Sequence, residues 1–395
     1  MNNVFLFDPT CEMAIANSSP YYHPPQNIVH FSEQLSWLPI LLADEADYII
    51  SKNEYNDRLS SIIEKLGRKL QEIVDSGIDY SFNRFVPWGW SPMIHHRYKN
   101  IKKMCGDSFH RMPNSEWSST VQKYYERAFA LDVCKGLIDC KLSSIQLLPK
   151  TDLPQVVQNM AELEKVLMDK RKIMAKLPLS SSGRGVLKVD VNNFTENERG
   201  RVRRMIEMQT YVTVEKYLDI STEFGMLFSY FSDEGLRFHG FSFTQTQNGR
   251  YNGNLVNQIP KNISQELLDE IRQKLVPNIG KVLDESGLFN NYNGYFGVDA
   301  CVYKEQGELK LNPCMEINLR MTMGHIALAA ADLLVRESRA EFKIYSGENF
   351  EYFCRQMRNT KPLLMIDEKI VSGFVSLSPE SENARTGAYL QVYNG

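Results

Sequence analysis

The sequence predicts a mixed α/β protein built from two or three domains. Its 395 residues exceed the size of one ordinary domain, which is about 100 to 200 residues. Near the N-terminus an apolar segment, a helical pattern and a second apolar segment follow one another, which is the rhythm of an open α/β unit. All four tryptophans lie before residue 120, so we expect the first part of the chain to form a domain of its own.

The composition excludes several classes of protein. With 43% hydrophobic and 24% charged residues the chain is neither disordered nor collagen-like. A formal net charge of -3 gives no basic field for nucleic acid or for an anionic membrane. No apolar run approaches the roughly 20 residues of a membrane span, and the N-terminus lacks a secretory pattern, so we expect a cytoplasmic protein. The seven cysteines form no CxxC pair, which indicates reduced thiols rather than disulfides or a zinc site.

Hydrophobic periodicity predicts the elements of the first 170 residues. The run VFLF at 4–7 is typical of a buried strand, and it ends at the breaker Asp8-Pro9 before a Pro- and Ser-rich stretch. The expected elements that follow are a helix over Phe31–Ala43, a strand at 48–51, an amphipathic helix over 58–77 and helical segments over 118–141 and 156–169.

Strands dominate the rest of the pattern. Strand-like runs at 172–177 and 186–191 flank a loop, and a capped helix over 195–209 precedes a strand at 210–218. Further along we expect two extended runs between Glu223 and Thr244, a long helix over 264–286, and strands at 294–303 and 309–321.

The loop between the first two of these strands has the composition of a phosphate-binding loop. In KLPLSSSGRGV, residues 176–186, a strand ends at Lys176. Serine hydroxyls, unhindered backbone N–H groups and one ammonium can then converge on a polyanion. The alternative is a plain hairpin loop, because Gly and Ser mark turns in general. The loop residues with candidate roles are Ser180, Ser181, Ser182, Gly183 and Gly185.

The run CMEINLRM at 314–321 carries the strongest chemical signal. Alternation along a strand places Glu316, Asn318 and Arg320 on one face and apolar side chains on the other. A carboxylate, an amide oxygen and a guanidinium in one row suit a hard divalent ion that bridges phosphates. Asp299 lies among apolar neighbours in YFGVDACVY, where an unpaired carboxylate would be costly to bury, so it is a second candidate ligand. A half-exposed strand with a salt bridge is the alternative.

In this order, the motifs resemble those of the ATP-grasp superfamily, and most closely those of biotin carboxylase, over about residues 120–330. The resemblance implies an N-terminal open α/β domain at 1–118 that helps to hold substrate. Two α+β subdomains, at 119–213 with the phosphate flap and at 214–395 with the metal site, would then clasp ATP. It implies that Lys176 and the Ser180–Gly185 loop bind phosphates, that Glu215, Lys216, Tyr217 and Leu218 form the adenine hinge, and that Glu223 contacts ribose. It further implies that Asp299, Glu316 and Asn318 hold magnesium, as two ions or with manganese in its place, and that Arg320 and Lys176 neutralise charge in the reaction.

The function implied by this resemblance is that of a carboxylate–amine ligase. Such an enzyme activates a small-molecule or peptide carboxylate as an acyl phosphate, joins it to an amine, and releases ADP and phosphate. Phosphotransfer or carboxylation on the same nucleotide site, and a non-catalytic ATP-binding regulator, are the alternatives. We expect no nucleic acid or membrane partner, and the chain is compatible with a homodimer.

The sequence leaves three assignments open. ATP-grasp chains usually carry a second nucleotide-binding lysine, for which Lys123, Arg127 and Lys135 are all candidates. His325 either approaches the substrate or caps a helix. The N-terminal loop and the WGW motif at 88–90 are candidates for a substrate-binding wall, through Glu12, Asn17, Tyr21, His23, His95, His96 and Arg97.

Overall fold

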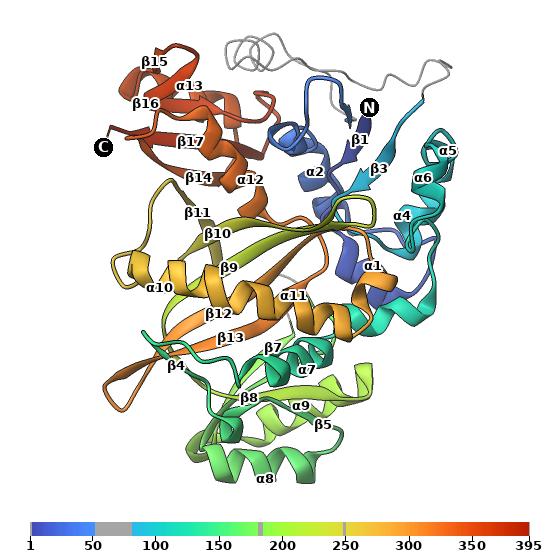
Figure 1. The fold of residues 1–395 in the computed structure, drawn as a ribbon, viewed down its shortest axis with the longest axis vertical. Coiled ribbons are helices and arrows are strands. Elements are labelled where there is room, and N and C mark those ends of the chain that lie inside the picture. Colours follow the sequence, from blue (N-terminus) through green and yellow to red (C-terminus); the bar gives the residue numbers. More distant parts are fainter. Residues whose placement is uncertain (1, 52–80, 181–184, 248–249, 395) are drawn as a thin grey trace.

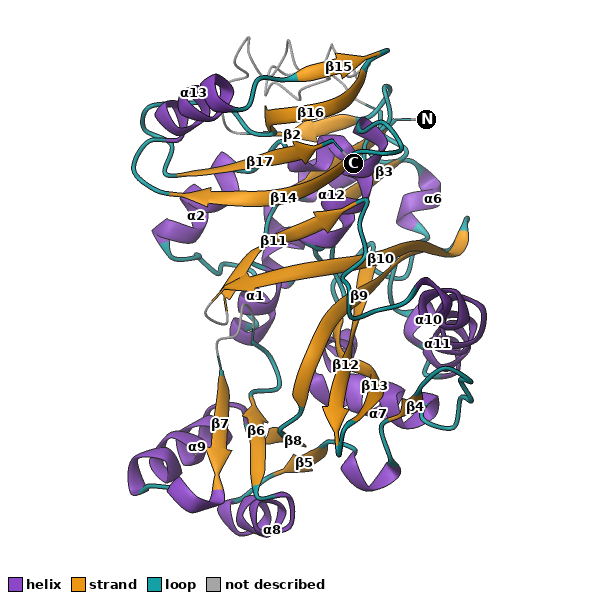
Figure 2. Ribbon diagram, turned by 90° about the vertical axis from the view of Figure 1, so that its left-hand side faces the viewer, coloured by secondary structure: helices purple, strands orange, loops and turns teal. Residues whose placement is uncertain are grey.

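The computed structural model describes residues 2–51, 81–180, 185–247 and 250–394, and the structural statements below refer to these residues. They form three β-sheets, of three, four and ten strands, with helices packed against them (Figures 1 and 2). The predicted mixed α/β class is therefore confirmed. None of the described helices is long and apolar enough to cross a membrane.

The three-stranded sheet is parallel and belongs to the N-terminal region. Strand β1 (Asn3–Leu6) lies between β2 (Tyr48–Ile50) and β3 (Arg84–Pro87), which confirms the strands expected at 4–7 and 48–51. The single helix expected over Phe31–Ala43 is wrong, because α2 (Gln26–Gln34) covers only the first part of that range and a separate 3-10 helix occupies Leu38–Leu41. Pro39 explains the break, since it has no N–H for a continuous helix. The helix expected over 58–77 lies outside the described residues. The region also contains α1 (Cys11–Asn17), α4 (Pro92–Arg97), α5 (Lys99–Lys103) and α6 (Asp107–His110).

The four-stranded sheet forms the lower unit of Figure 1. Its strands are β5 (Gln155–Val157), β8 (Val212–Lys216), β6 (Lys172–Lys176) and β7 (Val186–Asp190), in that order. Helices α8 (Met160–Lys170) and α9 (Glu196–Gln209) pack on it through a small apolar core. The capping box between Thr195 and Glu198 confirms the predicted start of the second helix.

The ten-stranded sheet is the centre of the molecule. Its order is β15-β16-β17-β14-β11-β10-β9-β12-β13-β4. Its strands are β4 (Gln146–Leu147), β9 (Asp219–Phe231), β10 (Gly235–Gln247), β11 (Arg250–Val256), β12 (Gly294–Glu305), β13 (Glu308–Asn318), β14 (Arg339–Ser346), β15 (Leu364–Ile366), β16 (Lys369–Ser376) and β17 (Thr386–Tyr393). Helices α12 (Met323–Ala330) and α13 (Phe350–Thr360) connect or flank the later strands.

Helices cover one face of β9, β12 and β13 (Figure 1). They are α7 (Arg127–Leu137) and a continuous helical stretch made of α10 (Gln265–Glu270), a π turn at Ile271–Leu275 and α11 (Val276–Glu285). The long helix expected over 264–286 is thereby confirmed. The helix expected over 118–141 is interrupted, because Glu126 adopts an extended backbone between a 3-10 helix and α7.

Strand alternation decides which face of this sheet is available for chemistry. Phe224, Met226 and Phe228 of β9 are buried in the core with the covering helices. The residues between them, Gly225 and Leu227, lie on the opposite face. That face carries the site described next.

Candidate functional site

Two adjoining cavities occupy the open face of the large sheet. One, of about 480 Å³, lies between the four-stranded and the ten-stranded sheets, and we name it the inter-sheet cavity. The other, of about 540 Å³, extends toward the N-terminal region, and we name it the N-terminal cavity. The residues that line both are Arg127, Gly225, Thr244, Asp299 and Glu316. The two cavities therefore meet at the carboxylates that the sequence marks as metal ligands.

Most residues predicted for the nucleotide line the inter-sheet cavity. Lys176 at the end of β6 forms an ion pair with Glu215 of β8, and both side chains are largely buried. Tyr217, Leu218 and Glu223 line the same space, together with apolar residues such as Met174, Val186 and Ile220. Such a cavity offers an apolar wall to a flat ring and a buried cation to a polyanion.

Lys216 does not line the cavity. Alternation along β8 turns its side chain away, where Nζ lies 2.7 Å from Asp152 Oδ2 and also contacts Glu305. The Lys216 side chain is therefore not placed to contact a ligand in the cavity.

Only the ends of the predicted phosphate loop belong to the described residues. Ser180 Oγ accepts a hydrogen bond of 3.1 Å from Arg127 Nη2. The carbonyl oxygen of Gly185 accepts one of 2.8 Å from the backbone N–H of Leu177, and Gly185 has a φ of 70°, which favours glycine. Ser181, Ser182 and Gly183 lie outside the described residues.

The two predicted acidic ligands face each other across neighbouring strands. Asp299 of β12 is paired in register with Glu316 of β13. Burial, with a further contribution from the Glu316 carboxylate, raises the pKa of Asp299 to about 7. Asn318 Nδ2 donates a hydrogen bond of 2.8 Å to Asp299 Oδ2. Two crowded carboxylates and an amide form an oxygen-rich set of the kind that Mg²⁺ prefers.

Among the described residues, no group of three or more His, Cys, Asp or Glu side chains converges as a metal site. The set above has two carboxylates and completes its oxygen donors with an amide. A cation held there would draw its remaining ligands from bound phosphates and water, which is common for Mg²⁺.

Of the three residues that the sequence left as candidates for a second nucleotide-binding cation, Arg127 is the one that lines both cavities. It is the first residue of α7, and its side chain is buried. Nη1 lies 2.8 Å from Glu316 Oε2, and Nε donates a hydrogen bond of 3.1 Å to the carbonyl of Leu177. Burial alone would lower the pKa of Arg127, but the Glu316 carboxylate outweighs it and raises the pKa.

Lys123 and Lys135, the other two candidates for the second nucleotide-binding residue, lie away from the cavities. Lys135 pairs with Asp132 on the exposed side of α7, and Lys123 lies over the ring of Tyr124, 4.8 Å from its centroid. Neither lines the two cavities. The signal in the sequence was a charged residue that opens an otherwise apolar helix, but spacing alone did not reveal its partner.

The N-terminal region reaches the site through Arg320. The Arg320 guanidinium forms an ion pair with Glu12 of α1, and Nη2 donates a hydrogen bond of 3.2 Å to Asn318 Oδ1. Trp88 accepts a hydrogen bond of 2.7 Å at its carbonyl from the N–H of Met321. Gly89 is required here, because a Cβ on it would lie 2.9 Å from Arg320 Cβ.

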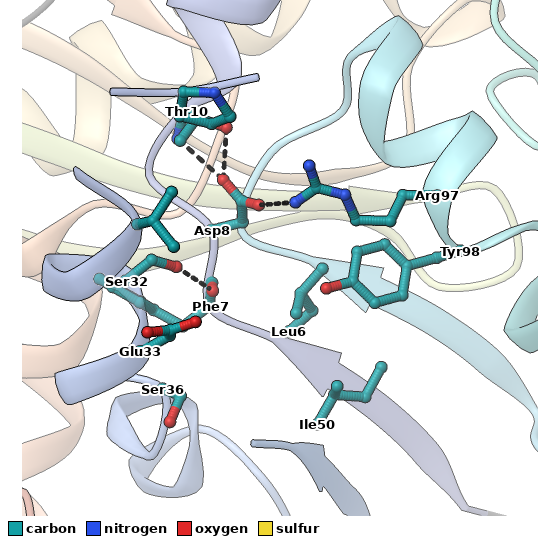
Figure 3. A pocket seen from close by; sticks show the side chains of 12 residues that line it. Leu6, Phe7, Asp8, Thr10, Ser32, Glu33, Ser36, Ile50, Arg97 and Tyr98 are labelled. Carbon is teal, nitrogen blue, oxygen red and sulfur yellow. Dashed lines mark hydrogen bonds and ion pairs between the residues drawn. The ribbon is translucent and has the colours of Figure 1, made fainter. Parts of the chain in front are cut away.

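The other residues proposed for the N-terminal substrate wall are not in the cavity. Asn17, Tyr21, His23, His96 and Arg97 are exposed, and His95 is buried against Trp90. Asp8 lines a separate pocket of only about 40 Å³, where it accepts hydrogen bonds from Thr10 and lies 4.0 Å from Arg97 (Figure 3). Glu12 and Trp88 do line the N-terminal cavity.

His325 caps a helix. Its Nδ1 bonds to the N–H and the hydroxyl of Thr322 at the start of α12, and Nε2 lies 3.2 Å from the carbonyl of Phe228. The ring is buried, and it does not line either cavity. Of the two roles left open by the sequence, capping is the one observed.

Solved structures resemble the whole chain at low sequence identity. An N5-carboxyaminoimidazole synthetase from Staphylococcus aureus complexed with ADP is 11% identical, with a TM-score of 0.51 and coverage of 100% of this chain and 93% of that one. An N5-carboxyaminoimidazole ribonucleotide synthetase from Thermus thermophilus is 10% identical, with a TM-score of 0.51 and coverage of 100% and 94%. The chain has the ATP-grasp fold. Family models and curated protein sequences give no match.

The ATP-grasp fold confirms the fold expected from the motifs. It is formed here by the four-stranded sheet and the ten-stranded sheet, and the first lies below the second in Figure 2. Residues of both sheets line the inter-sheet cavity. The residues after 335 extend the large sheet through β14, β16 and β17.

Proposed function

We propose that the protein is an ATP-dependent ligase that activates a carboxylate as an acyl phosphate and joins it to an amine, with release of ADP and phosphate. The observation that carries this proposal is the junction of two cavities at Asp299 and Glu316. A nucleotide in the inter-sheet cavity would direct its phosphates toward that junction, and a second substrate would approach from the N-terminal cavity. The ATP-grasp fold supports the assignment of the inter-sheet cavity to ATP.

Asp299, Glu316 and Asn318 are the residues that would hold magnesium. The crowding of Asp299 and Glu316, which favours a proton on Asp299, would equally favour a bound cation. Magnesium supplies charge neutralisation at the phosphates and a fixed geometry for them. The number of ions, and manganese as a substitute, stay predictions.

Cationic side chains of the chain would bind the phosphates and neutralise charge during the reaction. Lys176 would contact phosphate oxygens, and Arg127 would hold Glu316 and Ser180 in place beside them. Arg320 would neutralise the carboxylate as it attacks the γ-phosphorus, because attack of one anion on another is otherwise opposed by charge. An amine then attacks the acyl carbon, phosphate leaves, and the amine loses one proton to give an amide.

Ser180–Gly185 as the phosphate flap, residues 215–218 as the hinge and Glu223 as the ribose contact belong to the same proposal. Of these, Lys216 would take part through its backbone, because its side chain points to Asp152 and Glu305. The second substrates would be small molecules or peptides, and a homodimer is compatible with this function.

The test measures ADP and phosphate release from MgATP with pools of carboxylates and amines, and identifies the product by mass. We expect release to require both partners and the product mass to equal their sum less one water. Glu316→Gln should abolish release, whereas Glu308→Gln, an exposed residue at the start of the same strand, should not. ADP without phosphate would indicate phosphotransfer, turnover with bicarbonate alone would indicate carboxylation, and ATP binding without turnover would indicate a regulator.

A further inference from the structure

The charged side chains of the N-terminal cavity gather at the end that it shares with the inter-sheet cavity. Among the described residues that line it, Arg127 and Arg320 are the cationic ones. Arg127 is paired with Glu316 at 2.8 Å, and Arg320 is paired with Glu12. The described lining therefore offers no guanidinium or ammonium group without a carboxylate partner to an additional anionic group of the substrate.

A wall of neutral hydrogen-bonding side chains adjoins this end, because Thr244 also lines the inter-sheet cavity and Ser242 is the register partner of Gly225. Ser242 and Thr244 of β10 lie beside Asn254 and Tyr251 of β11, and all four line the cavity. Ser242 and Asn254 are 3% and 2% exposed, whereas Thr244 is exposed and Tyr251 is 42% exposed, so the wall has a buried base and an exposed rim. Because β10 is a strand, Ser242 and Thr244 point to the same face.

Asn254 organises the hydrogen bonds of this wall. Its Nδ2 donates to Ser242 Oγ at 2.9 Å and to Thr244 Oγ1 at 3.3 Å. Its Oδ1 accepts from the Tyr251 hydroxyl at 2.5 Å. Each polar atom of the Asn254 side chain thus has a partner inside the wall, and the amide holds the three hydroxyl groups in a fixed arrangement.

This arrangement determines what the wall can offer to a ligand. A hydroxyl that accepts a hydrogen bond retains its own proton, so Ser242 and Thr244 have donors to spare. The Tyr251 hydroxyl, whose proton goes to Asn254, retains acceptor lone pairs. The wall presents donors and an acceptor without charge. It suits a hydroxyl or a carboxamide, whereas a charged group would lose hydration there without a counter-charge.

Apolar side chains complete the lining of the cavity. Trp88 and Phe31 come from the N-terminal region, Leu227 from β9 and Ile344 from β14. Gly324 keeps the space beside the neutral wall open, because a Cβ on it would lie 2.6 Å from Ser242 Oγ.

We propose that the N-terminal cavity takes a carboxylate substrate that also carries an uncharged hydroxyl or carboxamide group, bound by Ser242, Thr244, Tyr251 and Asn254. Phosphate or a second carboxylate in place of that group is disfavoured. The inference rests on the proposed ligase function, since the reacting carboxylate is placed at Arg320 and the metal-binding row.

The experiment compares phosphate release from MgATP and ammonium chloride with four pools that differ in the polar group of the side chain. The neutral pool holds L-serine, L-threonine, L-asparagine and L-glutamine. The acidic pool holds L-aspartate and L-glutamate, the phosphorylated pool O-phospho-L-serine and O-phospho-L-threonine, and the cationic pool L-lysine and L-ornithine. We expect the neutral pool to give at least a tenfold higher rate. A higher rate with any of the charged pools would overturn the inference and leave the ligase proposal standing.

The Asn254→Asp variant tests the wall itself. The substitution preserves shape and adds a negative charge, so the KM for the neutral substrate should rise at least tenfold while the KM for ATP stays within twofold. Ser242→Ala should raise the KM for the same substrate and leave the KM for ATP within twofold. Asn252→Asp, on the same strand but outside the cavity lining, is the matched control and should behave as the unmodified protein. An unchanged KM in both wall variants would contradict the inference. Absence of phosphate release from all four pools, in a protein that does turn over with the broader carboxylate and amine pools described above, would contradict the inference and leave the ligase function standing.

Discussion

Arg127 Nη1 lies 2.8 Å from Glu316 Oε2, which joins the first residue of α7 to the proposed metal-binding row of β13. The same guanidinium contacts Ser180 and the carbonyl of Leu177, at the start of the predicted phosphate loop. One buried cation thus connects the acidic strand with the loop, across the two sheets of the fold. A planar guanidinium has the several donors that these contacts need, and a lysine has not.

Replacement of Arg127 by methionine should lower kcat/KM for ATP about 100-fold, because it removes a preorganised charge beside the phosphates. Arg127→Lys should lie between this variant and the unmodified protein, since the charge remains and the fork of donors is lost. Steady-state kinetics at saturating second substrate measures both effects.

Lys135→Met is the control for this prediction, because Lys135 lies on the exposed side of the same helix. It should change kcat/KM less than twofold. Thermal unfolding separates a loss of catalysis from a loss of fold. The role of Arg127 would be wrong if Arg127→Met folded normally and kept its activity.

Gly225→Val should uncouple ATP binding from the reaction. Gly225 lines both cavities, and a Cβ on it would lie 3.3 Å from Leu227 Cδ2 and 3.5 Å from Asp299 Oδ1. A valine side chain would fill the passage between the cavities. We expect ADP affinity, measured by calorimetry, to stay within about threefold and phosphate release to fall at least 100-fold.

Gly225→Ala should have an intermediate effect, because one methyl group fits with a small displacement of Leu227. Gly200→Ala, in α9 with open space around it, is the neutral control. Equal turnover by Gly225→Val and the unmodified protein would show that the substrates do not meet at this passage.

The parts of the site that lie on one strand could be predicted from the sequence. The parts that depend on contacts between distant strands could not. Alternation in CMEINLRM placed Glu316 and Asn318 on one face, and the register of β12 with β13 brings Asp299 to them. The neutral wall was not predicted, because Ser242 and Asn254 are ordinary strand residues until β10 and β11 pair. The fold class followed from the strand and loop order, whereas the breaks at Pro39 and Glu126 depend on local backbone preferences that periodicity does not detect.

Two buried histidines should make the fold sensitive to acid. Burial, with Lys102 nearby, lowers the pKa of His95 to about 3, and burial, with His239 nearby, lowers the pKa of His325 to about 3. An unfolded chain binds these protons near pH 6.5, whereas the folded chain does not until about pH 3. Stability is therefore lost as the pH falls between these values, with a slope of up to about 1.4 kcal/mol per pH unit for each histidine.

Urea unfolding between pH 7.5 and 4.5 measures this slope. His325→Gln should reduce this slope by the contribution of one histidine. This expectation holds whatever the substitution does to stability at pH 7.5. His23→Gln, at an exposed position, should leave it unchanged. An identical slope in His325→Gln and the unmodified protein would contradict the buried neutral state of His325.

Glu12→Gln should slow the chemical step without weakening ATP. Glu12 is a positioning residue, because its carboxylate holds the Arg320 guanidinium beside Asn318. The amide keeps the shape but loses the ionic hydrogen bond, which is worth more than a neutral one. We expect kcat to fall about 10-fold to 100-fold, as for the loss of one preorganised contact, with the KM for ATP within twofold.

The comparison with Arg320→Lys separates positioning by Glu12 from a general effect of charge. If Glu12 acts through Arg320, the double variant Glu12→Gln, Arg320→Lys should be no slower than Arg320→Lys alone, because the shared interaction is already lost. Glu337→Gln, at an exposed position, should leave kcat unchanged. Additive losses in the double variant would instead show that Glu12 contacts the substrate independently of Arg320.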